Sequence, residues 1–509
     1  MSNRRLHILT VLVASCSPLF APAQDTARIS GHRLAVSLRS NHMLESVNHP
    51  AVTYQDKPVI RKMGLWITTG STSIQASGAV CDVYTGASDF RPGPTRLNGG
   101  AAADTLQYNK VYTLRQGEVQ QHRAGWKQPG YQPSENISNW PANGPKGFAS
   151  VLAPYADVNR NGFYDPLQGD YPFVPEGELA YTISNDVAAA NRLASAAPQG
   201  AEVQTMVWIP ETQADTTLGL LAYFRFVVHN RSQQNWNGVA LSLAADFSLG
   251  DASDDYLVTD VHAGGLAAYN GTASDAVFGR SIPAVAIYML NRQVLSSMYF
   301  ENTGDAVRGK PTNMAHYHYL ARGRWKTGRN LAFGRAGLDG SIVTSYVYSN
   351  GTDPANMGIW NEGDAGNFPG NRTGLLTSDT FSLPAGGSAV LELALGVIRN
   401  VGNDPALLGA KMVQQKNAAL RQQKNTLPGL TDNPIEMRLY EDKMAIRSAG
   451  NSPLNVSVYD MTARQLATFC FLGAGIVNLK NLPGNGPVVF MVSDNHGRQV
   501  TGKALIPAK

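Results

Sequence analysis

Short stretches of alternating apolar and polar residues recur along the chain, and this is the pattern of β-strands that bury one face. The most pronounced stretches are rich in β-branched and aromatic residues and are separated by turn residues such as Asn, Gly and Ser. We expect strands spaced this closely to pair antiparallel with their neighbours along the chain. The strongest strand signals lie at 203–209, 218–228, 239–247 and 389–398.

Helical periodicity is scarce before the Asn-Asp-Pro sequence at 403–405. That sequence offers an N-cap followed by a proline at the first helical position. Leu408, Met412 and Ala419 then recur near helical spacing. We predict that this helix closes the main domain and that a turn-rich linker follows at 427–433.

The C-terminal residues carry a second set of strand patterns. Leu454, Val456 and Val458 alternate with polar residues and therefore share one face of a strand. Short strands separated by Gly-rich and Asn-rich turns predict a compact, immunoglobulin-like β-sandwich over 434–509. Its further strands are expected at 465–471, 476–479, 488–492 and 499–506.

This region resembles the type A C-terminal sorting domain of the type IX secretion system of the Bacteroidetes. The matching stretches are Val-Ser-Val-Tyr-Asp at 456–460 with Arg464 after it, Asn-Leu-Lys-Asn-Leu-Pro-Gly at 478–484 and Gly-Lys-Ala-Leu-Ile at 502–506. Ala463 stands where the family usually has Gly, and the usual Gly-x-Tyr is missing. The resemblance implies export by the type IX secretion machinery, then removal of the module and release or surface attachment. An ordinary immunoglobulin-like domain with another task is the alternative.

The N-terminus has the three-part order of a secretion signal, because two arginines precede an apolar run over 6–14 and small residues follow at 21–24. We predict a signal peptide over 1–24, with lipidation of Cys16 as the alternative. No later stretch reaches the roughly 18 to 20 apolar residues of a membrane-spanning helix. We therefore expect no transmembrane segment, and a location outside the cell or on its outer surface.

Composition supports a folded, turn-rich chain, since 43% of the 509 residues are hydrophobic, 16% are charged, 50 are Gly and 28 are Pro. With the strand patterns it predicts a mostly β protein, whose residues 25–426 form one large, loop-rich antiparallel β-sandwich or jelly-roll-like domain. The net charge of +4 is spread without a basic cluster, which argues against nucleic acid as a partner. We expect Cys81 and Cys470 to be separate thiols, with one long-range disulfide as the alternative.

The clearest candidate for chemistry is a loop over 157–170 that begins Asp-x-Asn-x-Asn-Gly. Oxygen-bearing side chains at positions 1, 3, 5 and 9, with Gly at position 6, match the first part of a calcium loop, because a hard cation needs convergent oxygens. Gln168 replaces the usual Glu at position 12, so the loop resembles the shorter calcium loops of dockerins and thrombospondin-type repeats. An Asn/Gly turn held by local hydrogen bonds is the alternative. The predicted ligands are Asp157, Asn159, Asn161, Phe163, Asp165 and Asp170.

A second group of carboxylates follows the strand predicted at 239–247. Its members repel one another unless they are solvated, protonated or bound to a cation, so calcium is again the predicted ligand. The alternative is an acid and base pair of a glycosidase, which needs a separation of about 5 to 9.5 Å across a cleft. The group consists of Asp246, Asp251, Asp254, Asp255 and Asp260, of which the first four are the predicted metal ligands.

Other candidates are weaker. His316 and His318 would lie on one face of a strand as half of a metal site, but a solvent-facing or packing role is the stronger expectation because no third ligand is evident. The sequence contains no His-Glu-x-x-His, Gly-x-Ser-x-Gly, phosphate-binding or dinucleotide-binding motif. If the protein binds glycans, the aromatic side chains expected to stack on sugars are Trp126, Trp140, Trp208 and Trp236, but core or strand packing is the stronger expectation for such residues.

The main region also resembles a group of large, uncharacterised Bacteroidetes proteins that end in the same sorting domain, a match that implies no known activity. We therefore expect a non-enzymatic, calcium-stabilised structural or adhesive protein outside the cell, with other copies of itself or surface glycans as partners. A secreted carbohydrate-active enzyme or glycan-binding module is the alternative. The stretches that carry the resemblance are 140–142, 157–165, 169–172, 185–186, 230–232, 254–256 and 268–271.

Overall fold

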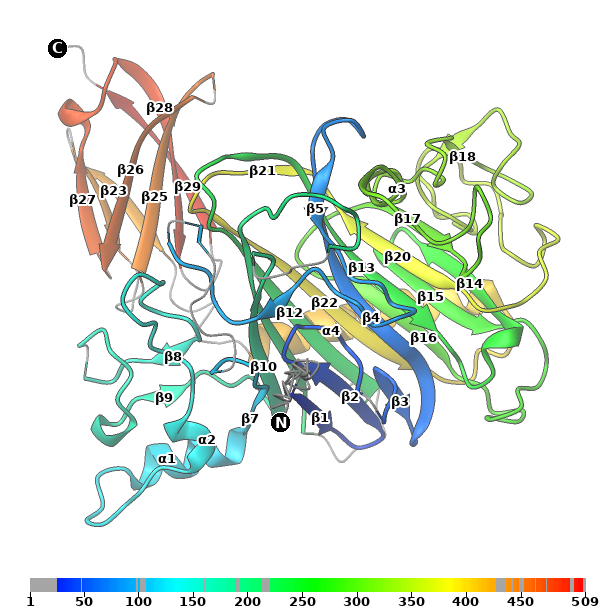
Figure 1. Cartoon of the computed structure of the whole chain (residues 1–509), viewed down its shortest axis with the longest axis horizontal. Helices are drawn as coiled ribbons and strands as arrows, with labels where there is room; N and C mark the ends of the chain where they lie inside the picture. The colour runs from blue at the N-terminus through cyan, green and yellow to red at the C-terminus, as the bar shows by residue number, and fades with distance from the viewer. Residues whose placement is uncertain are drawn as a thin grey trace, which may run out of the picture.

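The computed structural model shows a chain built mainly of antiparallel β-sheets (Figure 1). The predicted signal peptide and linker lie outside the described residues, and none of the helices in the described part is long and apolar enough to cross a membrane. The residues described are 25–46, 48–97, 99–100, 107–159, 161–187, 192–211, 220–426, 435–440, 443–447, 453–462, 464–472, 474–494 and 499–506.

One sheet, here named the first sheet, has the order β1-β2-β3-β4-β13-β20-β17, with β5 beside β4 and β21 beside β13. Its longest pairing joins β4 to β13, with Leu65 opposite Leu243. The strands are β1 (Thr26–Ser30), β2 (Leu34–Arg39), β3 (Val52–Tyr54), β4 (Lys57–Thr69), β5 (Ser77–Ala79), β13 (Trp236–Phe247), β17 (Val294–Phe300), β20 (Thr373–Ser378) and β21 (Phe381–Leu383).

The other sheet, named the second sheet, has the order β14-β15-β16-β22-β12-β11-β10-β6, with β7 beside β10. Its central strands β12 and β22 are buried along almost their whole length. The strands are β6 (Arg91–Pro92), β7 (Tyr112–Arg115), β10 (Glu178–Asn185), β11 (Ala201–Ile209), β12 (Leu221–Asn230), β14 (Asp255–Asp260), β15 (Gly265–Asn270), β16 (Ala284–Met289) and β22 (Ser388–Ile398).

The four strands predicted in the main region are all present, as β11, β12, β13 and β22, and the mostly β, sandwich-like architecture is confirmed. Pairing between successive strands is only partly right. β11 and β12 pair as expected, with Trp208 opposite Tyr223. β12 and β13 do not pair, because β12 continues to β22 in the second sheet while β13 joins the first sheet.

The two sheets enclose one large hydrophobic core, and a second core lies on the outer face of the second sheet. Side chains of β12 alternate between these cores, so that Phe224 and Phe226 point into the first and Tyr223 into the second. Trp208 of β11 stacks on Tyr223 with ring centroids 5.1 Å apart. The second sheet is therefore buried on both faces, which is unusual for an antiparallel sheet.

The predicted closing helix is confirmed as α4 (Pro405–Thr426), which covers part of that outer face and contacts β14, β16 and β22. Its N-terminus is capped by Asp404, whose Oδ1 accepts hydrogen bonds from the backbone N–H groups of Ala406 (2.9 Å) and Leu407 (3.0 Å). The tyrosine hydroxyl of Tyr223 donates to Gln422 Oε1 at 2.8 Å. Polar contacts thus fix the helix over an otherwise apolar face.

The rest of the outer face is covered by a chain segment between β7 and β10 that contributes Trp140, Leu152 and Tyr164 to the second core. Its elements, and those of the loop-rich region between β17 and β20, are small. They are α1 (Gln116–Gly125), α2 (Glu135–Ser138), β8 (Tyr155–Ala156), η1 (Pro166–Gln168), β9 (Tyr171–Pro172), α3 (Met314–Leu320), β18 (Leu331–Ala332) and β19 (Val343–Thr344). A further short helix, η3 (Ala252–Asp254), lies between β13 and β14.

The C-terminal residues form two further sheets around a third hydrophobic core. Leu454, Val456 and Val458 are all fully buried in that core, as the alternation predicted. The orders are β23-β24-β27 and β26-β25-β28-β29, in which β23 and β24 were not predicted. The elements are β23 (Glu436–Tyr440), β24 (Lys443–Arg447), β25 (Pro453–Asp460), β26 (Gln465–Leu472), β27 (Ala474–Asn478), η4 (Leu479–Asn481), β28 (Gly486–Asp494) and β29 (Gln499–Ile506).

One polar group lies between the two sheets of the main region. His42, which follows β2, is fully buried, and its Nδ1 is 2.7 Å from Ser184 Oγ on β10. Its ring lies against Phe90, with centroids 4.1 Å apart, and its Nε2 is 3.7 Å from the sulfur of Cys81, a free and buried thiol. Burial lowers the pKa of His42 to about 3.

We expect Leu408→Ala to lower the free energy of unfolding by about 2–5 kcal/mol, because it opens a cavity beneath α4. Leu408 is fully buried, whereas the preceding Leu407 is 41% exposed. Leu407→Ala is therefore the matched control and should cost less than about 0.5 kcal/mol. Urea unfolding of both variants measures the difference, and equal costs would mean that α4 is not packed as described.

We expect His42 to make the protein less stable as the pH falls. Its pKa is near 6.5 when unfolded but about 3 when folded, so below pH 6.5 only the unfolded chain takes up this proton. The free energy of unfolding should then fall by about 1.4 kcal/mol per pH unit relative to His42→Asn, between pH 6.5 and about 3. Asn suits the backbone here, since φ is +57°.

Unfolding curves recorded at several pH values test this expectation. His32→Asn, which removes an exposed histidine, is the control and should follow the wild-type pH dependence. A His42→Asn variant whose stability runs parallel to the wild type between pH 6.5 and 4 would show that His42 takes up its proton in the folded state.

Candidate cation-binding sites

The loop at 157–170 lies between β8 and β9 and is closed by its own side chains. Asp157 accepts hydrogen bonds from the backbone N–H groups of Asn161 (3.2 Å, to Oδ1) and Gly162 (2.8 Å, to Oδ2). Asn159 Oδ1 accepts from the N–H of Asn161 at 3.1 Å, and Asn161 Oδ1 accepts from that of Phe163 at 2.8 Å. Gly162 has φ +78°, which favours glycine. The first half of the predicted ligand set is thus gathered in one tight turn.

Asp170 ties the two ends of this loop together. Its side chain is fully buried, and its two oxygens accept from the N–H groups of Val158 (2.7 Å) and Asp165 (2.9 Å). Burial raises the pKa of Asp170, and the nearby charge of Asp157 adds to that effect. The imidazole Nε2 of His122 lies 3.0 Å from the carbonyl oxygen of Asp170 and links the loop to α1. Asp170 therefore has a clear structural role.

Asp165 has a separate local role, because it caps the short helix η1. Its Oδ1 accepts a hydrogen bond from the N–H of Leu167 at 3.0 Å. The structure thus connects Asp165 to Asp170 through the backbone, and not through a contact between their carboxylates. Whether the six predicted ligands bind calcium together stays a prediction.

The second predicted group is divided by the fold. Asp246 lies on β13 of the first sheet, where Arg61 donates to both of its oxygens, from Nε at 2.9 Å and from Nη2 at 3.1 Å. Asp260 ends β14 and accepts from the N–H of Ala263 at 2.6 Å. Asp246 is therefore held by an arginine, and Asp260 shapes the turn between β14 and β15.

The remaining aspartates of this group, Asp251, Asp254 and Asp255, lie just before or at the start of β14 and are joined by two residues that the sequence did not indicate. The N–H of Asp251 donates to Asp275 Oδ2 at 2.8 Å. The side-chain amide of Asn270 donates to Asp254 Oδ2 at 3.1 Å. Asp275 and Asn270 come from chain beyond β14, and only the strand pairing brings them to this place.

Burial sets the electrostatics of this cluster. Asp255 is fully buried, and its Oδ2 accepts from the N–H of Leu249 at 3.0 Å. Burial raises the pKa of Asp255 well above its usual value, and the charges of Asp254, Asp275 and Asp251 raise it further. Within the described ranges, no three His, Cys, Asp or Glu side chains form a metal-ligand group. A cation here would therefore need amide, backbone or water oxygens as additional ligands.

The expectation for the histidine pair was wrong about its element, because His316 and His318 lie in helix α3 and not on a strand. Positions two apart on a helix do not face the same side. His316 Nδ1 is 3.2 Å from Thr312 Oγ1, and His318 Nε2 is 3.0 Å from the carbonyl oxygen of Gly70. The stronger expectation of a solvent-facing or packing role agrees with these contacts, since His316 is half-buried and His318 is buried.

Three of the four tryptophans considered for sugar binding are core residues. Trp140, Trp208 and Trp236 are buried, and the Nε1 of Trp140 donates to the carbonyl oxygen of Pro154 at 3.0 Å. Trp126 is half-buried and lies against the Cα of Gly169, where a Cβ would come within 2.6 Å of the indole ring. These aromatic rings therefore support the fold instead of forming an open sugar platform.

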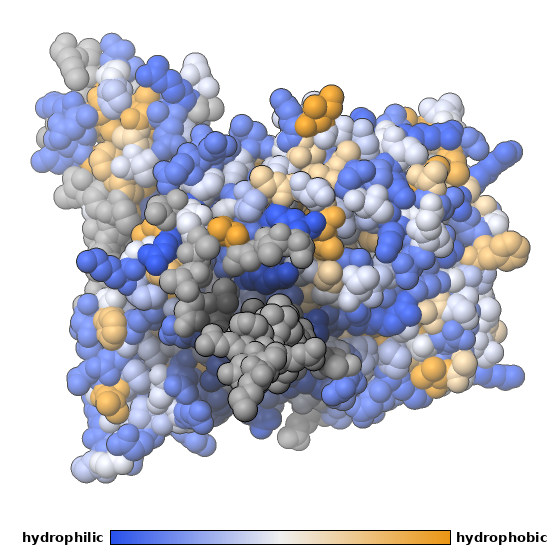
Figure 2. Space-filling model, in the orientation of Figure 1, coloured by the Kyte–Doolittle hydropathy of each residue, from blue (hydrophilic) through white to orange (hydrophobic). Residues whose placement is uncertain are grey.

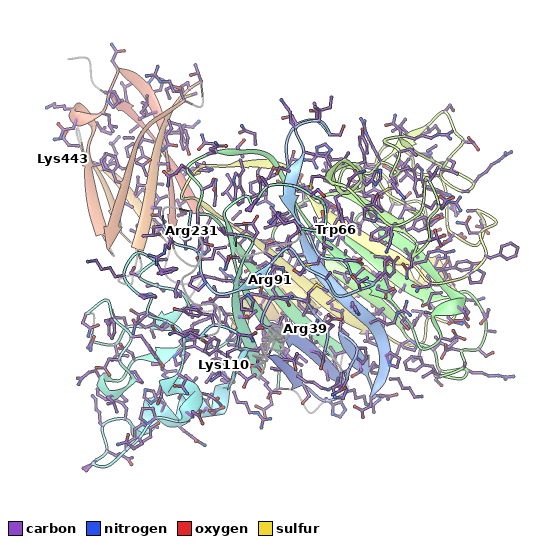
Figure 3. The ribbon with its side chains drawn as sticks, in the orientation of Figure 1. Arg39, Trp66, Arg91, Lys110, Arg231 and Lys443 are labelled. Carbon is purple, nitrogen blue, oxygen red and sulfur yellow. The ribbon has the colours of Figure 1, made fainter. Side chains whose placement is uncertain are left out.

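A small cavity in the described part of the main region is lined by aromatic and charged side chains. Trp66, labelled in Figure 3, contributes to its wall, and its indole Nε1 donates to the carbonyl oxygen of Cys81 at 2.8 Å. Its volume is about 10 Å³, room for about one water molecule, so it is far smaller than ligand pockets of roughly 300–1,000 Å³. The other lining residues are Asp82, Val83, Tyr84, Phe300, Lys310, Pro311 and Tyr317.

Comparisons with known proteins give little guidance. No protein-family model and no curated protein matches the chain. Among solved structures, similarity is found to a polysaccharide lyase (11% identity, TM-score 0.20, 60% of this chain and 34% of the lyase). A putative aldose 1-epimerase from Escherichia coli K12 is also similar (9% identity, TM-score 0.27, 74% of this chain and 99% of the epimerase).

A third similar structure is the family GH92 inverting mannosidase of Bacteroides thetaiotaomicron (8% identity, TM-score 0.19, 60% of this chain and 35% of the mannosidase). The chain thus spans about a third of the length of the lyase and of the mannosidase. Similarity at this level does not support an inference about a shared activity.

Proposed function

We propose that this chain is an exported, calcium-stabilised β-protein that serves as a structural or adhesive component outside the cell or on its outer surface. The structural part of the proposal rests on how the buried charged groups of the chain are paired. Catalysis requires titratable groups that converge on an accessible reacting atom. In the described part of the main region, several buried carboxylates are instead held by arginines and backbone N–H groups.

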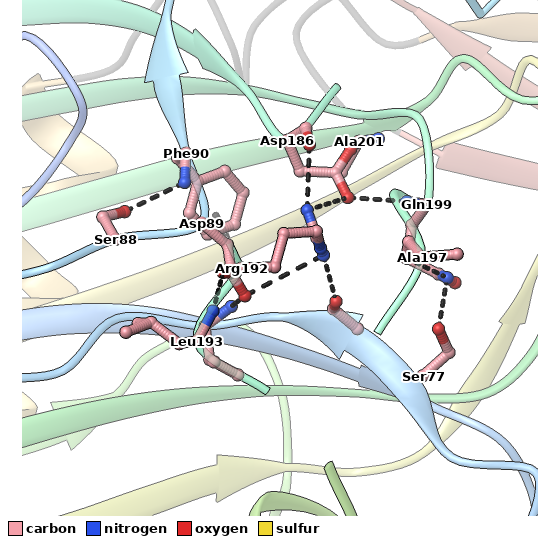
Figure 4. A network of polar contacts seen from close by, with 12 residues as sticks. Ser77, Ser88, Asp89, Phe90, Asp186, Arg192, Leu193, Ala197, Gln199 and Ala201 are labelled. Atoms are coloured by element: carbon pink, nitrogen blue, oxygen red, sulfur yellow. Dashed lines mark hydrogen bonds and ion pairs between the residues drawn. The ribbon is translucent and has the colours of Figure 1, made fainter. Parts of the chain in front are cut away.

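The clearest case is Arg192, which bridges two buried aspartates (Figure 4). Its Nη1 is 3.3 Å from Asp186 Oδ2, and its Nη2 is 3.8 Å from Asp89 Oδ2 and donates to the carbonyl oxygen of Gly78 at 2.6 Å. Asp89 also accepts from the N–H of Leu193 at 2.7 Å. Because Gly78 belongs to β5 of the first sheet and Asp186 follows β10 of the second, this network joins the two sheets.

Two arginine–glutamate pairs likewise hold buried carboxylates in place. Arg231, labelled in Figure 3, donates to Glu202 at 2.7 Å, and Glu202 also accepts from the N–H of Thr95 at 2.8 Å. Arg372 donates to Glu362 at 2.9 Å. Removing one partner of such a pair leaves an uncompensated buried charge, so these pairs are needed to keep the fold stable.

Calcium binding by the loop at 157–170 is supported by the geometry of its turn. The carboxylate at position 1 accepts from the N–H groups of positions 5 and 6, which pulls the side chains of Asp157, Asn159 and Asn161 into one turn. A carboxylate oxygen that accepts one hydrogen bond keeps a second lone pair for a cation. Calcium bound there would connect this turn to the buried Asp170 anchor.

The export part of the proposal rests on the predicted signal peptide at 1–24 and on the resemblance of 434–509 to a type IX sorting domain. Under this proposal the working protein is 25–426, and its partners are the type IX secretion machinery during export and other copies of the chain or surface glycans afterwards. The face shown in Figure 2 is largely polar, with separate hydrophobic spots, as suits a protein surrounded by water.

We expect removal of calcium by a chelator to lower the melting temperature of the full chain, because a ligand that binds only the folded state at about 100 times its Kd contributes about 2.7 kcal/mol. Asp157→Ala should remove the part of this shift that comes from the loop. Asp56→Ala, at an exposed aspartate outside the loop, is the control and should keep the full shift. Differential scanning calorimetry with and without chelator measures these shifts.

Two outcomes would contradict a calcium role for the loop. One is a melting temperature that does not change on chelation. The other is an Asp157→Ala variant whose response to calcium equals that of the wild type. In either case the hydrogen bonds of Asp157 would serve only the turn.

We expect electron microscopy of the surface or secreted fraction of the producing cells to show ordered assemblies that contain this chain, and to show them less often after chelation. Labelling with an antibody against the chain identifies the assemblies, and cells that lack the gene are the control. Dispersed monomers that cleave a polysaccharide would instead support the alternative, a secreted carbohydrate-active enzyme.

A further inference from the structure

The start of β14 and the end of β15 bring two buried polar side chains face to face. Asp255 stands directly opposite Asn270 in the antiparallel pairing. The N–H of Gly271 donates to the carbonyl oxygen of Asp254 at 2.6 Å, so Asp255 and Asn270 form a pair without hydrogen bonds between their own backbones. In such pairs the side chains point to the same face and are especially close.

Three side-chain oxygens at this place are buried and accept no hydrogen bond from any of the described residues. They are Asp254 Oδ1, Asp255 Oδ1 and Asn270 Oδ1. Asp255 and Asn270 are both fully buried. A buried acceptor without a partner costs about 1–3 kcal/mol, and more when it is charged, so three together require an explanation.

The remaining polar atoms of these side chains make hydrogen bonds that fix the orientation of each side chain. The amide nitrogen of Asn270 donates to Asp254 Oδ2 at 3.1 Å and to the hydroxyl of Thr272 at 2.9 Å. Asp255 Oδ2 accepts from the N–H of Leu249 at 3.0 Å. The hydrogen bond from its amide nitrogen to the Asp254 carboxylate therefore orients the Asn270 side chain. Its carbonyl oxygen accepts no hydrogen bond from the described residues.

The surroundings are negatively charged. Asp275 is buried, and its carboxylate accepts from the N–H groups of Asp251 (2.8 Å) and Val277 (2.7 Å). None of the ion pairs found among the described residues includes Asp251, Asp254, Asp255 or Asp275. A positive charge that offsets these carboxylates has to come from outside the chain or from a proton.

We propose that Asp254 Oδ1, Asp255 Oδ1 and Asn270 Oδ1 bind a divalent cation of the calcium type. Calcium prefers carboxylate and amide oxygens, and it takes about six to eight of them, so water and backbone carbonyls complete the shell. Two carboxylates supply two negative charges that match the ion. The site does not depend on Asp157 or its loop. Compared with the ligands predicted from the sequence, it contains Asn270 instead of Asp246, which Arg61 holds elsewhere.

The cation would fasten three pieces of chain at the edge of the second sheet. β14 is the outermost strand of that sheet, Asp254 ends the η3 turn before it, and Asn270 ends β15. Asp254 also accepts from the hydroxyl of Thr272 at 3.1 Å. Binding therefore holds the start of the edge strand against its neighbour, where backbone pairing exists on one side only.

Asp255→Asn is the main test, because it removes one charge and keeps the shape of the side chain. Calorimetric titration of the full chain with Ca²⁺ should show one site fewer in this variant, or a Kd for that site raised by at least about tenfold. Asp157→Ala is measured in parallel and should affect only the loop site. Unchanged Ca²⁺ binding in Asp255→Asn would overturn the proposal and indicate that a protonated Asp255 donates to Asn270.

Asn270→Asp tests the same site by adding a charge, and it decides the question if Asp255→Asn does not fold. The melting temperature of this variant should be lower than that of the wild type in chelator and should recover when Ca²⁺ is added. A loss that Ca²⁺ does not reverse would overturn the proposal. Loss of binding in Asp255→Asn alone would support this site but not the loop, whereas loss in Asp157→Ala alone would do the opposite.

Discussion

The double-sided burial of the second sheet is the constraint on which the remaining structure depends. A strand that is apolar on both faces leaves no solvated side for charged residues, so these gather at strand ends and in loops. Arg225 and Glu392 are exceptions within the strands, and they stand opposite each other with 3.3 Å between their charged groups. Both α4 and the segment between β7 and β10 are needed because the outer face would otherwise be exposed.

The local elements of this fold were predictable because their signals are local. The cap at Asp404 and the spacing of Leu408 and Met412 indicated α4, and alternation indicated β25 through Leu454 and its neighbours. Strand partners were not predictable in the same way. Periodicity shows which face of a strand is buried, but it does not show that β13 leaves β12 for the first sheet.

The same difference separates the two candidate cation sites. The loop that starts at Asp157 forms its turn within a few residues, so spacing alone revealed it. The second cluster depends on register, which places Asn270 opposite Asp255 and brings Asp246 next to Arg61, whose side chain holds it. The spacing of the aspartates along the chain did not show that Asp246 is held by an arginine, whereas Asp254 and Asp255 lie next to an asparagine.

The position of β22 has a consequence for the order of folding. This strand lies between β16 (Ala284–Met289) and β12 (Leu221–Asn230), although it begins only at Ser388, far beyond both of them along the chain. The second sheet therefore consists of two separate halves until residues 388–398 are available, and its outer face gains α4 later still. Such long-range closure makes folding slow. Until residues 388–398 have been synthesised, the strand edges of β12 and β16 that later pair with β22 have no partner.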